Sequence, residues 1–468
     1  MPIPTRAARR LSAVIHKCLL MLPAWLILQL GATTALAQSE PESVIPIGDG
    51  PYALELTADG QTAIVSLLFP AEDSDPNLFR VDLARNEVVG QYRFGRRLFR
   101  IGTVDPDMLK SAGGGMPVVM VNGDVDKLTM VDLESGQQTA QIRTGQNPSN
   151  VEVAQHSSAL VGNTTNLAVV TNGTGGSLSL IDLDSRTSLK DIKVGDDPRD
   201  VVVTPDGGYL MTVLRGENAV AVLDLASSAE VARVSVGQDP TAIEIAPDGT
   251  RAVVANLTNN SISIINTENK RAPKVVRDPK TNGLQFPVGV QPTSVAITPD
   301  SQTAFVGNAG SSWVTVVDLD KPEVLGIVRI QQPGDSIASA TAALKVTPDG
   351  SKLVVAESGN AADLLVYDIA SLETEPVPAI EVPDEPGTNI FLERKEGESC
   401  GFYTAGLTLQ EGASEGFWGM EVKTTAGKRL LEGGINLGGA FDADARNPGF
   451  GAFNIANKAH ENQVVSIT

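Results

Sequence analysis

The sequence predicts an all-β fold: a seven-bladed β-propeller followed by a small C-terminal β-sandwich-like domain. A phrase of β-branched residues that ends in Asp-Leu, or in a close variant, occurs seven times. Its acidic or amide residues recur every 42 to 52 residues. Each interval holds four short apolar runs, and four strands in a repeat of roughly 40 to 50 residues are typical of a propeller blade. The recurring residues are Asp82, Asp132, Asp182, Asp224, Asn266, Asp318 and Asp368.

One repeat, from Pro198 to Gly237, shows the four expected strands in order. They are the runs 200–204, 209–214, 219–223 and 230–236, and turn residues separate them. The first turn reads Pro-Asp-Gly, in which Pro presets φ and Asp-Gly tolerates positive φ. The same turn returns at 246–249 and 347–350, so we interpret it as a hairpin connection. The recurring Asp of the third strand is likewise expected to bind the backbone of a turn.

Four second strands end in a shared pattern, namely VVTN at 169–172, VVAN at 253–256, FVGN at 305–308 and VVAE at 354–357. The first-strand phrase 237–249 also has copies. On these residues the chain resembles the bacterial YVTN-type β-propeller repeat proteins, within the lactonase-like and WD40/YVTN repeat-like superfamily. The resemblance covers residues 44–382. It implies the propeller fold, but a fold of this kind does not fix a chemistry.

Residues 1–37 differ from the rest. Arg6, Arg9 and Arg10 form a basic start, residues 19–30 are apolar, and Ala35-Leu36-Ala37 offers a cleavage site. This order predicts a secretory signal peptide, and the paired arginines also permit the twin-arginine route. We therefore expect an exported bacterial protein, periplasmic or extracellular, with no transmembrane segment after cleavage.

The expected mature chain is strongly acidic, because 56 Asp and Glu face 32 Lys and Arg once residues 1–37 are removed. Such a charge argues against binding of nucleic acid or anionic lipid. It is consistent either with solubility outside the cell or with attraction of cations. We expect a monomer.

Cysteine and histidine are scarce. Cys18 leaves with the signal peptide, so Cys400 is alone, and His156 and His460 are the remaining histidines. No intramolecular disulfide is then expected. A Cys-x-x-Cys-His haem attachment motif is absent, and a histidine-rich metal centre needs more imidazoles. The sequence predicts no cofactor, apart from a divalent cation such as calcium.

Six of the expected first strands align, and first strands line the central channel of a propeller. Alternate positions share one face, and on that face polar residues interrupt the apolar pattern. The candidate ligand-binding residues are Glu55, Asn150, Glu152, Arg199, Asp200, Glu244 and Lys345. The acidic groups face a water-filled channel or pair with Lys345 and Arg side chains, or they bind a divalent cation or a polar ligand. Glu55, Glu152 and Glu244 are the candidate ligands for a hard cation. Arg96, Arg97 and Arg100 cluster where the second blade is expected to begin.

Ring closure has two candidate strands, 44–47 at the start of the repeats and 377–382 at their end. A propeller must join its first and last blades, because an open edge exposes unpaired backbone groups. We favour pairing of the N-terminal strand into the last blade.

Residues 387–468 lose the repeat and hold 14 of the 45 glycines. Alternating apolar residues predict a C-terminal β domain resembling a sandwich. Its aromatic residues either fill a core or, with Trp418, form a face for a carbohydrate or a partner.

The sequence favours a non-catalytic binding or scaffolding module of the bacterial cell envelope. Its partner would be a protein or polysaccharide of the envelope, or a small ligand in the channel. The alternative is a lactonase-like hydrolase that acts at the channel mouth, for which the sequence identifies no catalytic residue.

Overall fold

The computed structural model describes residues 39–377, except 49, 69–75, 95–97, 110–114, 123–124, 156–163, 331–339 and 359–362, and four strands between 389 and 436. The chain divides into two units after Val377. Within the described residues, no helix is long and apolar enough to cross a membrane.

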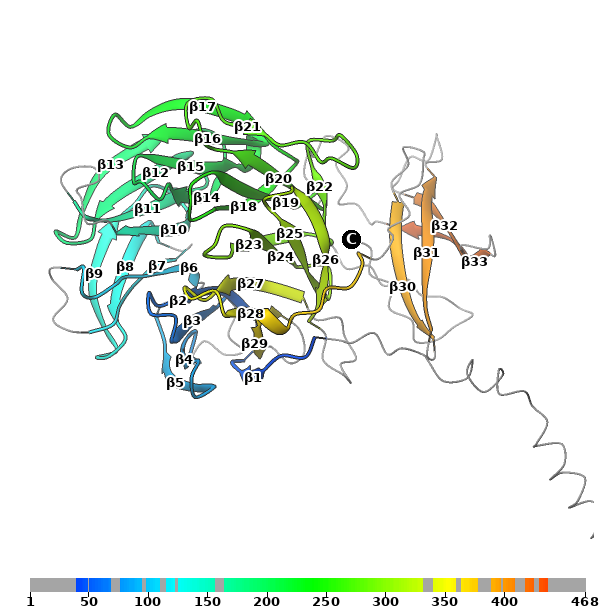
Figure 1. Ribbon diagram of the computed structural model, residues 1–468, viewed down its shortest axis with the longest axis horizontal. Coiled ribbons are helices and arrows are strands. Elements are labelled where there is room, and N and C mark those ends of the chain that lie inside the picture. The colour runs from blue at the N-terminus through cyan, green and yellow to red at the C-terminus, as the bar shows by residue number, and fades with distance from the viewer. Residues whose placement is uncertain are drawn as a thin grey trace, which may run out of the picture. The chain divides into compact units, whose positions relative to one another are not determined.

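The first unit is a seven-bladed propeller, and each blade is an antiparallel sheet with its strands in chain order (Figure 1). Blade 1 comprises β2 (Pro51–Leu56), β3 (Thr62–Leu67), β4 (Leu78–Asp82) and β5 (Glu87–Tyr92). Blade 2 comprises β6 (Leu98–Thr103), β7 (Pro117–Asn122), β8 (Lys127–Asp132) and β9 (Gln137–Arg143). Blade 3 comprises β10 (Pro148–Gln155), β11 (Asn166–Asn172), β12 (Ser177–Asp182) and β13 (Thr187–Lys193). Blade 4 comprises β14 (Pro198–Val203), β15 (Tyr209–Leu214), β16 (Ala219–Asp224) and β17 (Ala229–Ser235).

Blade 6 follows the same plan, whereas blades 5 and 7 vary it. Blade 5 comprises β18 (Pro240–Ile245), β19 (Arg251–Asn256) and β20 (Ser261–Asn266), and two short strands, β21 (Lys274–Val275) and β22 (Phe286–Pro287), pair with β20 at its edge. Blade 6 comprises β23 (Pro292–Ile297), β24 (Thr303–Asn308), β25 (Trp313–Asp318) and β26 (Glu323–Arg329). Blade 7 comprises β27 (Ala340–Val346), β28 (Lys352–Ser358), β29 (Asp363–Asp368) and the N-terminal β1 (Ser43–Pro46). Two 3-10 turns follow strands, η1 (Arg215–Glu217) and η2 (Ile369–Ser371).

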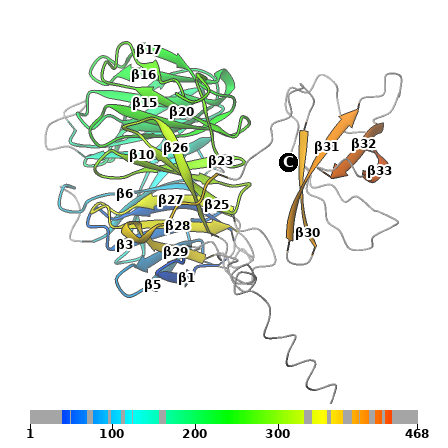
Figure 2. The ribbon, with the colours of Figure 1, turned by 45° about the vertical axis from the view of Figure 1, so that its right-hand side comes forward.

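The core lies between neighbouring blades, where the faces of adjacent sheets meet. Second and third strands are buried on both faces, and this explains why β7 reads as an uninterrupted apolar run. The outer strands alternate, as in β5, because one of their faces meets water. Two views of the ribbon show the sheets arranged around a common centre (Figure 2). The predicted all-β, seven-bladed fold is confirmed.

The ring is closed by its N-terminal strand. β1 pairs antiparallel with β29, from Ser43 opposite Val366 to Pro46 opposite Asp363. Ile45 is 1% exposed in the cluster that joins blades 1 and 7. The predicted N-terminal closure is confirmed. The rival segment begins at Val377 and continues into residues outside the described part; just before it, Glu375 forms a bridge with Ile327 of blade 6.

The recurring Asp residues cap turns, as predicted. The Asp82 Oδ1 atom accepts hydrogen bonds from the backbone N–H groups of Ala84 and Arg85, both at 3.0 Å. Asp318 accepts the equivalent pair at 2.8 and 2.9 Å. These carboxylates therefore hold hairpins together in successive blades, and they take no part in the candidate site.

A glycine and an asparagine recur together for a steric reason. A Cβ atom on Gly237 would lie 2.5 Å from the Cγ atom of Asn256, and one on Gly289 would lie 2.5 Å from the Cγ atom of Asn308. Each asparagine donates hydrogen bonds from its Nδ2 atom within its own blade. The glycine three residues before a first-strand proline and the asparagine that ends the second strand are thus two halves of one contact.

The second unit contains one antiparallel sheet in the order β30 (Asn389–Glu396), β31 (Ser399–Thr408), β32 (Phe417–Thr424) and β33 (Arg429–Asn436). A sandwich needs a second sheet facing the first. Residues 437–468 lie outside the described residues, so the sandwich-like arrangement stays a prediction.

Candidate functional site in the central channel

A bulge at the start of each first strand sets the height of the channel residues. In every blade the pairing register shifts by one residue at this point, for example between Pro198 and Asp200. A bulge re-aims the residues that follow it, so the residue just after the shift is equivalent in all blades. These residues, the Asp200 ring, are Ala53, Arg100, Asn150, Asp200, Ala242, Ser294 and Ala343.

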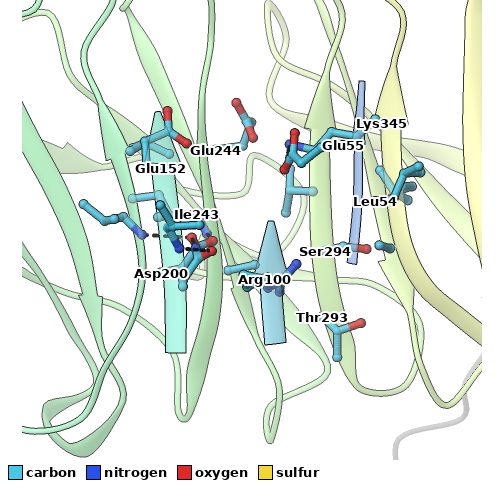
Figure 3. A pocket seen from close by; sticks show the side chains of 18 residues that line it. Leu54, Glu55, Arg100, Glu152, Asp200, Ile243, Glu244, Thr293, Ser294 and Lys345 are labelled. Carbon is cyan, nitrogen blue, oxygen red and sulfur yellow. Dashed lines mark hydrogen bonds and ion pairs between the residues drawn. The ribbon is translucent and has the colours of Figure 1, made fainter. Parts of the chain in front are cut away.

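Two residues further along each first strand lies a second set of equivalent positions. Side chains two apart in a strand point to the same face. This set, the Glu152 ring, comprises Glu55, Gly102, Glu152, Val202, Glu244, Ala296 and Lys345. Figure 3 shows Glu55, Glu152, Glu244 and Lys345 at one level of the channel, and Arg100, Asp200 and Ser294 at the next.

The two rings enclose a cavity of about 50 Å³. A water needs on the order of 10–15 Å³ measured in this way, so the cavity accommodates a few waters or one small group. Six of the seven predicted site residues line it, namely Glu55, Asn150, Glu152, Asp200, Glu244 and Lys345.

Lys345 and Glu55 form an ion pair across the seam, which is where blade 7 meets blade 1. The Lys345 Nζ atom donates to Glu55 Oε1 at 2.9 Å, and the side chains are 32% and 28% exposed. Burial alone would lower the pKa of Lys345, but the Glu55 and Glu244 carboxylates hold that pKa above its ordinary value. Lys345 is therefore a cation resident in the channel.

Glu152 and Glu244 are different, because neither side chain forms a hydrogen bond or an ion pair within the described part of the chain. Their side chains are half-buried by surface area. Protein surrounds the narrow channel, however, and few waters can solvate the carboxylates. Burial raises the pKa of Glu152 well above its ordinary value, and Glu244 raises it further. Burial also raises the pKa of Glu244 to about 7, although Lys345 opposes the change.

Asp200 connects three blades. Its Oδ1 atom accepts from Val201 N at 2.8 Å and from the Nδ2 atom of Asn150 in blade 3, while Oδ2 accepts from Ile243 N of blade 5 at 2.8 Å. Burial raises the pKa of Asp200, and Arg100 opposes this shift. Asp200 and Asn150 thus bind each other and the backbone, which leaves Glu152 and Glu244 as the open acceptors.

Two residues that line the cavity, Arg100 and Ser294, are not among the site residues predicted from the sequence. Arg100 lies in the channel with its Cζ atom 5.6 Å from the centre of the Tyr52 ring, and Tyr52 itself contacts Phe99 edge to face. Its strand was not among the six aligned ones, although Arg100-Ile101-Gly102 repeats their alternation. Ser294 was aligned but was not singled out. Arg199 does not line the cavity, because its guanidinium binds Asp197 at 2.9 Å.

A metal site gains no support from this geometry. No group of three or more His, Cys, Asp or Glu side chains within the described residues is arranged to hold a metal ion. Around the cavity the positive charge comes instead from Lys345 and Arg100. His156 lies outside the described residues.

Replacing Asp200 by Ala should destabilise the propeller by about 1–3 kcal/mol, because the Ile243 N–H group would lose its acceptor in a buried position. The measurement is urea unfolding at pH 7. Ser294→Ala is the matched control at the same level of the channel, since the buried Ser294 Oγ atom has no hydrogen-bond partner among the described residues; we expect little change from it. Equal losses in the two variants would contradict a cross-linking role for Asp200.

Comparisons with known proteins agree with this architecture. Residues 162–309 match the family described as Cytochrome D1 heme domain. Among solved structures, hydrazine synthase from Kuenenia stuttgartiensis is 17% identical, with a TM-score of 0.56 over 72% of this chain and 99% of that chain. The Cps50 (Swd1) beta-propeller domain of Myceliophteria thermophila is 9% identical, with a TM-score of 0.55 over 71% of this chain and 99% of that chain. No curated protein matches.

These likenesses define the fold. The family match covers less than half of the chain, and both structural identities are low. The chain is a seven-bladed β-propeller, and its fold is similar to the solved structures of hydrazine synthase and of the Cps50 (Swd1) beta-propeller domain.

Proposed function

We propose that this protein is an exported, non-catalytic binding module of the bacterial cell envelope, of the YVTN-type repeat kind. The observation that carries the proposal is the pair of channel carboxylates, Glu152 and Glu244, which face a cavity without a partner among the described residues. A rigid ring of sheets holds them at one level. Preorganised groups of this sort cost little to order when a ligand binds.

The ligand that fits is a small positively charged group. The cavity of about 50 Å³ is far below the roughly 300–1,000 Å³ of sites for drug-sized molecules. The group would be a free cation or the charged end of a protein or polysaccharide of the envelope. The acidity of the whole chain would draw such a group toward the channel.

A haem does not fit the matched region. Residues 162–309 contain no histidine and no cysteine, and Met211 is fully buried between blades 4 and 5. Haem iron in proteins is held by side chains of these kinds or by tyrosine, and Tyr209, the tyrosine of this region, packs against the same cluster as Met211. The proposed function therefore does not involve a haem.

Melting of the mature chain tests the proposal. Calcium chloride, methylammonium chloride and a chelator would be compared for the wild type and for Glu152→Gln with Glu244→Gln. A cation that binds the native state at a hundredfold excess over its Kd should stabilise the wild type by about 2.7 kcal/mol. The double variant should lose this gain, because Gln carries no charge.

The rival function, a lactonase-like hydrolase, draws on the same two carboxylates, since groups with raised pKa values can act as general acids or bases. Lactone hydrolysis that Glu244→Gln abolishes would support the hydrolase. Stabilisation by neither cation would contradict the binding module.

A further inference from the structure

The channel contains more negative than positive charge, as the charged side chains of the seven innermost strands show. Acidic groups come from β2, β10, β14 and β18, and basic groups come from β6 and β27. β23 contributes Thr293 and Ser294, which do not titrate in this range. The charged residues are Glu55, Arg100, Glu152, Asp200, Glu244 and Lys345.

Both basic groups are already engaged. Lys345 donates to Glu55, and Arg100 lies over Tyr52 and compensates Asp200. The excess of two negative charges therefore falls on Glu152 and Glu244. Val202 of blade 4 holds the equivalent position between them, so no side chain of that blade at this level neutralises either carboxylate.

Two like charges that face one narrow cavity cannot both ionise cheaply, because each is poorly solvated and repels the other. Without a ligand, the response that costs the least free energy is for one of the two carboxyl groups to retain its proton. Figure 3 shows both side chains at the same level of the channel. The Coulomb effect of Glu244 on Glu152 follows burial as the strongest influence that raises the Glu152 pKa.

We propose that Glu152 and Glu244 form a proton-binding pair, which keeps at least one proton at neutral pH and makes the propeller less stable as that proton is lost. This property goes beyond cation binding and does not depend on it. The pair sets the charge of the channel according to the pH outside the cytoplasm.

The sign of the pH dependence follows from proton binding. The native pKa of Glu244 is about 7 against an ordinary value of 4.5, and the pKa of Glu152 is also raised. Between pH 4.5 and about pH 7 the native state holds a proton that the unfolded chain has released. Stability is then fully present below about pH 4.5 and is lost as the pH rises through about 7. The unfolding equilibrium constant rises up to about tenfold per pH unit for each such proton.

The test is urea unfolding of the mature chain between pH 5 and pH 8.5 for the wild type, both single Gln variants and the double variant. Gln imitates a protonated carboxyl group in size and charge. The double variant should match the wild type at pH 5 and show an unfolding constant at least tenfold smaller at pH 8. Glu268→Gln is the control, because Glu268 is exposed between β20 and β21 of blade 5 and its loss should leave the pH profile unchanged.

Carbon-13 NMR of labelled glutamate carboxyl groups gives a second readout that needs no stability measurement. In the wild type, at least one glutamate signal should titrate near pH 7 and be missing from the spectrum of the corresponding Gln variant. If all glutamate signals titrate near 4.5, or if the double variant follows the wild-type stability at every pH, the proposal is overturned. Should the variants fail to fold, the wild-type titration alone decides.

Discussion

Lys345→Met will destabilise the propeller by about 3 kcal/mol at pH 7.5. The change removes one of the two basic side chains that face the cavity and leaves Glu55, Glu152 and Glu244 without the ammonium that now holds Glu55. Breaking a buried pair by removing one partner costs about 3–5 kcal/mol, and the lower end applies because a third of each side chain reaches water. Urea unfolding gives the loss directly.

Two further variants separate charge from side-chain volume. Lys352→Met removes a lysine of blade 7 that binds Glu42 at 3.1 Å, and the two side chains are 31% and 52% exposed. An exposed pair of this type contributes at most about 1 kcal/mol. Adding Glu55→Gln to Lys345→Met should restore part of the loss, because the stranded carboxylate disappears. Equal losses for Lys345→Met and Lys352→Met would refute the channel argument.

Ile45→Ala will cost about 2–4 kcal/mol, because it opens a cavity where the closing strand is buried between blades 1 and 7. Ile45 is 1% exposed and packs in a cluster with residues from both blades, among them Leu54 and Leu364. Thermal and urea unfolding of the protein measure the effect.

Val44 supplies the matched control on the same strand. It is 43% exposed and faces away from the cluster, so Val44→Ala should change stability by less than about 0.5 kcal/mol. A small effect at both positions would mean that β1 closes the ring without contributing to its stability.

Much of the fold was predictable because its repeats obey local rules. Turn chemistry recurs wherever an Asp caps a hairpin, as Asp82 and Asp318 do. The period of two placed Glu55, Glu152, Glu244 and Lys345 on one face of the first strands, and all four line the cavity. Alternation is a property of each strand alone, so it can be read without knowledge of the partner strands.

Contacts between distant residues could not be predicted in the same way. The pairing of Glu55 with Lys345 depends on which blades become neighbours when the ring closes. Arg100 was not assigned to the channel, because Leu98 stands where five of the other blades have a proline; the bulge after Leu98 restores the common register. Arg199 was assigned to the site on proximity to Asp200, yet a turn carboxylate, Asp197, holds its guanidinium.

The pairing of β1 with β29 also governs the order in which the chain can fold. Ser43 and Val366 are direct partners, and more than three hundred residues of chain separate them. β1 is synthesised before the other strands of the propeller, so it cannot pair with β29 until nearly the whole propeller has been made. Until then the edge of β29 stays open to other chains, and such long-range contacts are slow to form. The unclosed ring is therefore exposed to pairing with other chains, and so to aggregation, for that interval.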